Sequence, residues 1–227
     1  MPLSIFDLDN TLLNGDSDHA WGEFLASKGA VDGKIYQQAN DSFYQQYQDG
    51  NLDIHQFLEF SLKPLAENSK EQLDIWHQEF MRDYIVPMLQ QKAYKLLQTH
   101  REQGHFLLII TATNGFITEP IAELLGVDAI LATNAEFKNG CYTGKVAGTP
   151  CFQHGKIIRL MQWLENKAYD LTGSYFYSDS HNDLPLLKIV ENPIAVDADE
   201  TLSNFAKQNQ WPHISLREEV NSLRAYI

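Results

Sequence analysis

Short apolar runs recur along the chain, and polar or turn-forming residues bound each of them. Runs of this length, rich in Ile, Leu, Phe and Tyr, are typical of strands that are buried in a parallel sheet. The pattern therefore predicts strands within residues 3–8, 104–113, 128–133, 173–179, 192–197 and 212–216.

Segments with the helical spacing of apolar residues lie between these runs. Such an alternation of strands and helices favours an α/β fold with a doubly wound parallel sheet. An Asn-Gly pair at Asn139 and Gly140 also predicts a small hairpin over residues 136–146. The predicted helices cover residues 88–104, 115–126, 155–170 and 183–192.

Residues 14–87 interrupt the alternation, because they contain helix-favouring segments and no strand-like run. We therefore predict a helical domain in residues 14–87, inserted after the first strand of an α/β core formed by residues 1–13 and 88–227. The aromatic residues of the insertion are expected to form the core of a helical bundle. They are Trp21, Phe24, Tyr36, Phe43, Tyr44, Tyr47, Phe57, Phe60, Trp76 and Phe80.

Composition and charge narrow the classes of function. The 227 residues are 44% hydrophobic and 21% charged, as is usual for a globular protein. Acidic residues outnumber basic ones 30 to 17, and no run of Lys or Arg could follow a phosphate backbone. Nucleic acid is therefore not an expected partner.

Targeting signals and cysteine spacing point to an ordinary cytoplasmic protein. The chain has no apolar stretch long enough to span a membrane, and its start lacks a secretory signal. Cys141 and Cys151 lack a metal-binding spacing and are expected to be reduced. These features leave the oligomeric state open.

Polar residues gather directly after several of the predicted strands. Ligands of a parallel α/β sheet collect at the carboxyl ends of its strands, so these residues are expected to share one site. The set comprises Asp7, Asp9 and Thr11 after the first strand, Thr111, Ala112, Thr113 and Asn114 after the second, Lys156 at the start of a later helix, and Asp179, Asn182 and Asp183 after residues 173–178.

Carboxylates, a lysine and hydroxyls beside a helix N-terminus are the groups that bind a phosphate together with a hard divalent cation. Mg²⁺ is the expected cofactor, because it takes oxygens from a few carboxylates and leaves its other positions to water and substrate phosphate. Free backbone N–H groups near Gly115 suit phosphate oxygens. Contacts with the substrate or its phosphate are expected from Thr11, Ala112, Thr113, Asn114 and Asn182.

Asp7 and Asp9 lie two positions apart, and in an extended segment such side chains point the same way. We expect Asp7 to attack phosphorus and form an aspartyl-phosphate, and Asp9 to protonate the leaving oxygen and later deprotonate water. The cation would then meet the backbone carbonyl of Asp9, together with Asp7 and Asp179, and Asp183 would hold a water on it.

Two further groups are expected to stabilise charge at the phosphorus. Lys156 would neutralise the nucleophile and the phosphoryl oxygens, and Thr111 would donate one hydrogen bond.

These residues resemble the motifs of the haloacid dehalogenase superfamily, within it the branch that includes the phosphoserine phosphatases. "DLDNT", from Asp7, is similar to its first motif, "IITAT" with Thr111 to its second, "HGK" with Lys156 to its third, and "SDSHNDLP" with Asp179 and Asp183 to its fourth. Each motif alone is weak, but their order and the helical insertion between the first two also match. The resemblance implies a Rossmann-like core with a helical cap of the C1 type after the first strand, and hydrolysis of a small phosphorylated metabolite.

The resemblance also implies which cap residues meet the substrate. In phosphoserine phosphatases, an acidic residue nine positions after the nucleophile contacts the substrate ammonium, and that position is Asp16 here. A cap arginine binds the substrate carboxylate in that branch, but the only arginine of residues 14–87 is Arg82, near their end. An amine without a carboxylate, such as histidinol phosphate or a phosphoethanolamine-like ester, is therefore favoured. Alternatively, Asp16 and Asp18 cap the first helix of the insertion.

Other functions are also consistent with parts of this residue pattern. A receiver domain of a signalling relay also groups acids, a Thr, a Lys and Mg²⁺, but it places the Lys last and is shorter. A phosphotransferase or mutase of the same superfamily would pass the phosphoryl group to another hydroxyl instead of water. A binding protein without activity is disfavoured, because every expected reactive position is filled.

Overall fold

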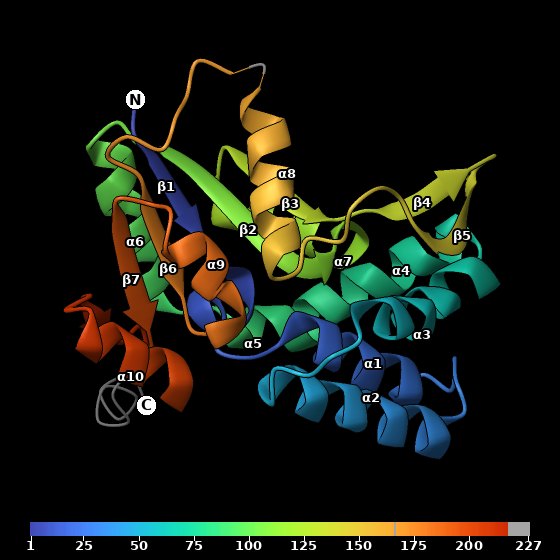
Figure 1. The fold of residues 1–227 in the computed structure, drawn as a ribbon. Helices are drawn as coiled ribbons and strands as arrows, with labels where there is room; N and C mark the ends of the chain where they lie inside the picture. Colours follow the sequence, from blue (N-terminus) through green and yellow to red (C-terminus); the bar gives the residue numbers. More distant parts are fainter. Residues whose placement is uncertain (166, 218–227) are drawn as a thin grey trace, which may run out of the picture.

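The computed structural model describes residues 1–165 and 167–217, and a parallel sheet lies at its centre (Figure 1). The strands follow the order β3-β2-β1-β6-β7-β8, so that β1 lies between β2 and β6, where the strand order reverses. All six strands predicted from the apolar runs are confirmed. They are β1 (Leu3–Phe6), β2 (Phe106–Asn114), β3 (Ala129–Thr133), β6 (Tyr175–Ser178), β7 (Asn192–Val196) and β8 (His213–Ile214).

Helices cover both faces of the sheet, because successive side chains of each buried strand point to opposite sides. In β2, Leu107 and Ile109 pack with residues of α6 and α7, whereas Leu108 and Ile110 pack with residues of α8, α9 and α10. The bounds are α6 (Gln91–Glu102), α7 (Gly115–Leu125), α8 (His154–Leu164), α9 (Leu184–Leu187) and α10 (Glu200–Gln208).

Three helical segments differ from the sequence-based expectation. The helix predicted over residues 183–192 follows a 3₁₀ turn at His181–Asp183 and ends at Leu187, and the helix predicted over residues 155–170 ends at Leu164. Helix α10 was not predicted at all, although Asp199 caps its first turn by accepting a hydrogen bond from the Leu202 N–H.

The inserted segment is helical, as predicted, and lies near the carboxyl end of the sheet (Figure 1). Trp21, Phe24 and Phe80 pack against one another there, with ring centroids 5.1 to 5.7 Å apart. They belong to the same buried cluster as Phe6 of β1, so one apolar core joins the insertion to the sheet. The helices are α1 (Ser17–Ser27), α2 (Gly33–Gln48), α3 (Ile54–Glu67) and α4 (Lys70–Phe80), followed by a π-helical turn (Met81–Ile85) and α5 (Val86–Met88).

The predicted hairpin is formed by β4 (Ala135–Lys138) and β5 (Cys141–Val146), which pair antiparallel. Strand β5 packs against α3 of the insertion, so the hairpin supports that helix from the core side. Cys141 and Cys151 are both free thiols, as expected. Among the described residues, no helix combines the length and the apolar character needed to cross a bilayer.

A polar network of histidines lies beneath the centre of the sheet. The Nδ1 atom of buried His100 is 2.8 Å from Ser4 Oγ, and its Nε2 atom is 2.7 Å from the Tyr177 hydroxyl. His105 Nδ1 is 2.9 Å from His100 Nδ1. Burial, together with the neighbouring His105, lowers the pKa of His100 to about 4.

We expect acid to weaken the fold through His100. Its folded-state pKa lies below the ordinary 6.5, so the unfolded chain binds more protons between those values, and stability falls as the pH drops from 6.5 towards 4. The loss attributable to this one group amounts to up to about 3 kcal/mol. Urea unfolding of the wild type and of His100→Gln over this pH range measures it. The variant should show the shallower pH dependence, and parallel curves for the two proteins would contradict the assignment.

Candidate active site

The chain turns sharply where β1 ends. Residues Leu8–Leu12 form a π-helical turn rather than continuing the strand, with Asn10 at φ 56°. Asp7 and Asp9 nevertheless line the same cavity, although a turn rather than a continuous strand carries Asp9. The Asp9 carboxylate accepts hydrogen bonds from the Ser17 N–H at 2.6 Å and the Thr113 hydroxyl at 2.8 Å.

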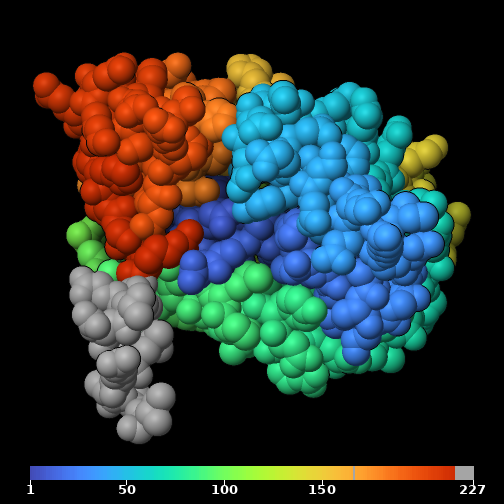
Figure 2. Space-filling model, turned by 90° about the horizontal axis from the view of Figure 1, so that it is seen from below, coloured from blue at the N-terminus to red at the C-terminus, as the bar shows by residue number. Residues whose placement is uncertain are grey.

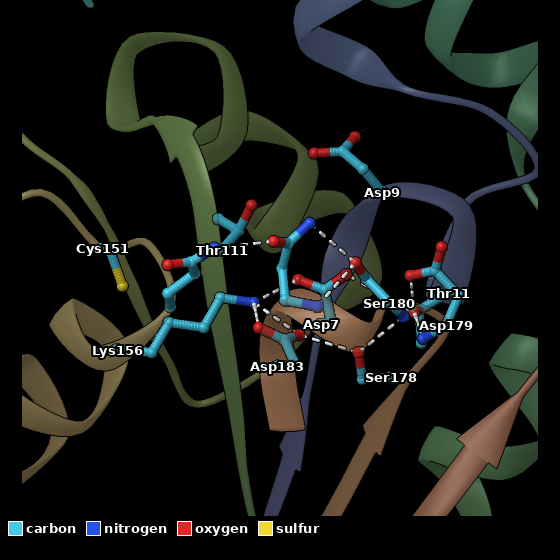
Figure 3. A network of polar contacts seen from close by, with 12 residues as sticks. Asp7, Asp9, Thr11, Thr111, Cys151, Lys156, Ser178, Asp179, Ser180 and Asp183 are labelled. Carbon is cyan, nitrogen blue, oxygen red and sulfur yellow. Dashed lines mark hydrogen bonds and ion pairs between the residues drawn. The ribbon is translucent and has the colours of Figure 1, made fainter. Parts of the chain in front are cut away.

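A buried lysine lies between two carboxylates at the centre of the site (Figure 3). Lys156 Nζ is 2.8 Å from Asp7 Oδ1 and 2.7 Å from Asp183 Oδ1. Burial by itself would lower the pKa of Lys156, but the two carboxylates outweigh it and raise that pKa above its ordinary value. The lysine is therefore a permanent cation that holds the two acids together.

A close backbone approach places Lys156 at this point. A Cβ atom at Gly155 would lie only 2.0 Å from the carbonyl oxygen of Pro150, so only glycine allows the loop at residue 150 to pack against the start of α8. Gln153, directly before the helix, has φ 47°. The "HGK" sequence thus fixes the lysine through the glycine that precedes it.

Hydroxyl groups orient the remaining carboxylates. The Thr11 hydroxyl donates to Asp179 Oδ1 at 2.9 Å and approaches Asp7 Oδ2 at 3.5 Å. The Ser178 hydroxyl donates to Asp183 at 2.7 Å. Asp7, Thr11, Lys156, Asp179 and Asp183 are thus brought together in the structure, as the sequence predicted.

Negative charge dominates the site. Burial raises the pKa of Asp7 to about 7, with repulsion from Asp183 adding to the shift and Lys156 opposing it. Burial and the charge of Asp16 raise the pKa of Asp9 to about 7 as well. The pKa of Asp179 is also raised, mainly by burial and then by Asp7. One ammonium thus faces several carboxylates, and the site favours a further cation.

A cavity opens beside Asp7 and Asp9 and extends into the inserted helices. About 560 Å³ of space lies between its walls, with the open solvent at its mouth included. Its walls are formed by Asp7, Asp9, Asp16, Asp18, His19, Asn40, Phe43, Tyr44, Tyr47, Leu52, Ile54, Phe57, Thr111, Ala112, Thr113 and Phe152.

A second hollow reaches the site from the other side. Figure 2 shows it between the inserted helices, in blue and cyan, and the carboxyl-terminal part of the chain, in orange and red. Asp179 and His181 lie in its wall, and Tyr44 and Tyr47 separate it from the first cavity because they line both. Solvent therefore approaches Asp179 directly.

Several aromatic residues of the insertion do not form a bundle core. Phe43, Tyr44, Tyr47 and Phe57 line the cavity, so the prediction that they are core residues is wrong. Their spacing identifies the apolar face of a helix, but a face turned toward another helix and one turned toward a cavity have the same periodicity.

The two acidic residues at the start of α1 have different roles. Asp16 caps the helix by accepting a hydrogen bond from the His19 N–H at 2.8 Å, and it also lines the cavity. Asp18 lines the cavity without capping the helix. Arg82 is exposed and pairs with the adjacent Asp83, outside the cavity wall.

The expected phosphate-binding residues are only partly at the cavity. Thr111, Ala112 and Thr113 line it, whereas Asn114 is buried at the start of α7 and is not part of its wall. The Asn182 amide donates to the Tyr47 carbonyl at 3.0 Å and accepts from Gln153 at 2.9 Å. Asn182 therefore ties the insertion to the core in this structure.

Sequence reasoning overlooked Asn40, Tyr47 and Phe152 as parts of the site. Phe152 and Tyr47 meet with ring centroids 6.1 Å apart, across the boundary between core and insertion. Asn40 and Tyr47 share a face of α2, seven residues apart, but no spacing in the sequence relates them to Phe152, which meets Tyr47 only when the insertion folds onto the sheet.

Comparisons with known proteins point to one family. A model of the haloacid dehalogenase-like hydrolases matches residues 5–188. A histidinol-phosphatase of Neisseria meningitidis serogroup C (strain 8013) is 47% identical over 219 residues, which cover 95% of this chain and 99% of that protein.

Solved structures share the fold. A Bordetella pertussis Tohama I protein of unknown function matches with a TM-score of 0.90 and 43% identity, over 95% of this chain and 99% of that one. A substrate-bound phosphoserine phosphatase matches with a TM-score of 0.70 over 100% of this chain and 98% of that one. At 18% identity, the latter likeness concerns the fold alone.

Removing the charge of Asp9 should stabilise the metal-free protein. The folded state holds this group at a pKa of about 7, above its ordinary 3.8, so ionised Asp9 lowers the stability increasingly as the pH rises through that interval. At pH 8 in a chelator, we expect Asp9→Asn to raise the free energy of unfolding by about 1–3 kcal/mol, and the gain should shrink at pH 5. Denaturant titration measures it, with exposed Asp49→Asn as the control. A less stable Asp9→Asn protein at pH 8 would refute the expectation.

Proposed function

The chain belongs to the haloacid dehalogenase-like hydrolase family and is a phosphomonoester hydrolase, and we propose that its substrate is a small cytosolic amine-bearing ester, with histidinol phosphate as the best candidate. The observation that carries this substrate assignment is the acidic, aromatic cavity beside Asp7. A receiver domain is excluded, because the family model spans residues 5–188.

We assign Asp7 as the nucleophile. One of its oxygens is held by Lys156 at 2.8 Å, which fixes the carboxylate and leaves the other oxygen to attack phosphorus. A bond from Asp7 to phosphorus then forms, and the bond from phosphorus to the ester oxygen of the substrate breaks. Water cleaves the resulting aspartyl-phosphate in a second step, which releases inorganic phosphate and restores the Asp7 carboxylate.

We assign Asp9 as the general acid and base. Its pKa of about 7 allows it to hold a proton before the reaction, which the departing alkoxide then receives. The resulting Asp9 carboxylate removes a proton from the water that attacks the aspartyl-phosphate. Hydrogen bonds from the Ser17 N–H and the Thr113 hydroxyl hold the carboxyl group beside the cavity throughout.

Lys156 provides electrostatic stabilisation close to the phosphorus. Its cation lies against the attacking carboxylate of Asp7, where negative charge accumulates on the phosphoryl oxygens. Asp183 accepts from the same ammonium group and so positions it. Thr111, Ala112 and Thr113 are the wall residues nearest in sequence to the start of α7, where backbone N–H groups favour an anion.

The residues present fit Mg²⁺, which proteins of this family generally use. Thr11 brings Asp7 and Asp179 to the same hydroxyl, and the surplus of carboxylates over ammonium groups favours a cation. Within the described residues, no three His, Cys, Asp or Glu side chains are grouped as a metal cage, which agrees with the preference of Mg²⁺ for few protein ligands. Asp7, Asp179 and the backbone carbonyl of Asp9 would hold the ion, and Asp183 would support it. When bound, Mg²⁺ supplies positive charge that draws the substrate phosphate towards Asp7.

The charge of the cavity supports an amine rather than an amino acid. Asp16 and Asp18 are directed into it, and no Lys or Arg is among the described residues of its wall. An ammonium group is attracted there, whereas the carboxylate of phosphoserine would be repelled and left without a partner. A histidinol-phosphatase at 47% identity supports the same choice.

Phosphate release from a panel of esters tests the proposal. With Mg²⁺, the wild type should hydrolyse histidinol phosphate at least about 100-fold more efficiently than phosphoserine, because the latter brings a carboxylate beside Asp16. Asp7→Asn keeps the shape of the side chain but removes the nucleophile, and should lower kcat by at least about 1,000-fold. A chelator should abolish release. Activity of Asp7→Asn at the wild-type rate, or a preference for phosphoserine, would overturn the assignment.

A further inference from the structure

The part of the cavity wall that the inserted helices form carries polar and aromatic groups that the phosphate chemistry does not use. We call this part the ring pocket and define it by Asp18, Asn40, Phe43, Tyr44 and Phe57, which come from α1, α2 and α3. Its combination of ring faces, one amide and one carboxylate is typical of a site for a flat, polar ring.

Asn40 is held in one orientation. Only 4% of the residue is exposed, and its Nδ2 atom donates a hydrogen bond of 2.9 Å to the His19 carbonyl. Its amide packs directly on Gly22 of α1, where an added Cβ atom would lie 2.5 to 2.9 Å from the Asn40 amide atoms. Gly22 therefore makes room for the amide, and the His19 carbonyl decides which of its ends is the donor.

The Oδ1 atom of Asn40 is the acceptor left over by this arrangement. Among the residues that the structure describes, none donates a hydrogen bond to it, whereas the Nδ2 end is occupied. Asn40 lines the cavity, so this acceptor points to a donor supplied by a ligand.

The surroundings specify the kind of donor. Phe43 and Phe57 lie with ring centroids 5.5 Å apart, and Tyr44 packs at 4.9 Å from the His19 ring, so flat faces bound the pocket. Asp18 lines the same pocket, and burial together with the charges of Asp16 and Asp9 raises the pKa of its carboxyl group, so a cationic ligand would favour its ionised form. A planar ring that carries N–H groups and accepts a positive charge matches all three features.

We propose that Asn40 is a specificity-determining residue that accepts a hydrogen bond from a ring N–H of the substrate. The enzyme then selects a phosphomonoester with an N–H heteroaromatic ring, such as imidazole, over one with a hydrocarbon ring of similar size. This inference rests on the proposed function and deepens it, because it assigns the part of the substrate that lies away from the phosphate.

A merely structural role for Asn40 makes a different prediction. If the residue only joined α2 to α1 through the His19 carbonyl, its loss would reduce turnover of every substrate alike. A recognition role instead concerns only substrates with a ring N–H, because a pocket that pairs with a polar group rejects the analogue that lacks it.

The experiment compares three esters that share an ammonium group: histidinol phosphate, phenylalaninol phosphate, which has a ring without N–H groups, and phosphoethanolamine, which has no ring. The wild type should prefer histidinol phosphate over phenylalaninol phosphate by about 100-fold in kcat/KM. In Asn40→Leu, we expect kcat/KM for histidinol phosphate to fall by about 10- to 100-fold because KM increases. For the other two esters, kcat/KM should change at most about threefold.

Gly22→Ala serves as a second variant that leaves Asn40 in the chain. The added methyl group displaces the amide and should reduce the same preference, even though alanine favours the helix more than glycine does. Gly33→Ala is the matched control, because its Cβ atom would meet only ordinary contacts at 3.7 Å and beyond, and it should behave as the wild type. An equal loss on all three esters in both Asn40→Leu and Gly22→Ala would overturn the proposal.

Binding of the dephosphorylated products separates this inference from the proposed function. Calorimetry should show tighter binding of histidinol than of phenylalaninol to the wild type, and no such difference in Asn40→Leu. If this preference is found while histidinol phosphate is not hydrolysed, the proposed substrate is wrong, but the role of Asn40 in recognising the ring is supported. If the wild type binds both products equally, the proposed role of Asn40 is refuted, whichever ester the enzyme hydrolyses.

Discussion

The buried ammonium of Lys156 between Asp7 and Asp183 is the interaction on which the site depends. The two carboxylates lie on different segments, after β1 and after β6, and without the lysine they would face each other as unpaired charges in a dry environment. Because Gly155 lets the preceding loop pack closely, α8 begins where its lysine reaches both acids. Two ion pairs that share one ammonium group thus link three distant parts of the chain.

The site nevertheless keeps more negative charge than it neutralises. Asp9 is buried and Asp179 is partly buried near Asp7, each without a lysine of its own, and their pKa values are raised. Such an arrangement reduces the stability of the fold and favours a bound cation. The inserted helices extend the acidic character of the site into the cavity through Asp16 and Asp18.

The insertion and the core act as one structure around this pattern. Their apolar side chains form a continuous cluster, and the Asn182 amide joins the Tyr47 carbonyl across the boundary. The cavity exists only because the helices are fixed in this way against the carboxyl end of the sheet. Polar and aromatic residues of the insertion, among them Asn40 and Tyr44, thereby line the same cavity as Asp7 and Asp9 of the core.

The strands, the helical character of residues 14–87 and the grouping of Asp7, Lys156 and Asp183 could be predicted from the amino-acid sequence, because buried strands are apolar runs and their carboxyl ends meet at one edge of the sheet. Helix α10 could not be predicted in this way, because it has few apolar positions. The contact of the Asp9 carboxylate with Thr113 and the cavity beside the aromatic face of α2 became evident only in the folded chain. The spacing of apolar residues predicts which face of a helix or strand is buried. Whether another helix or a cavity covers that face depends on contacts between residues far apart in the chain.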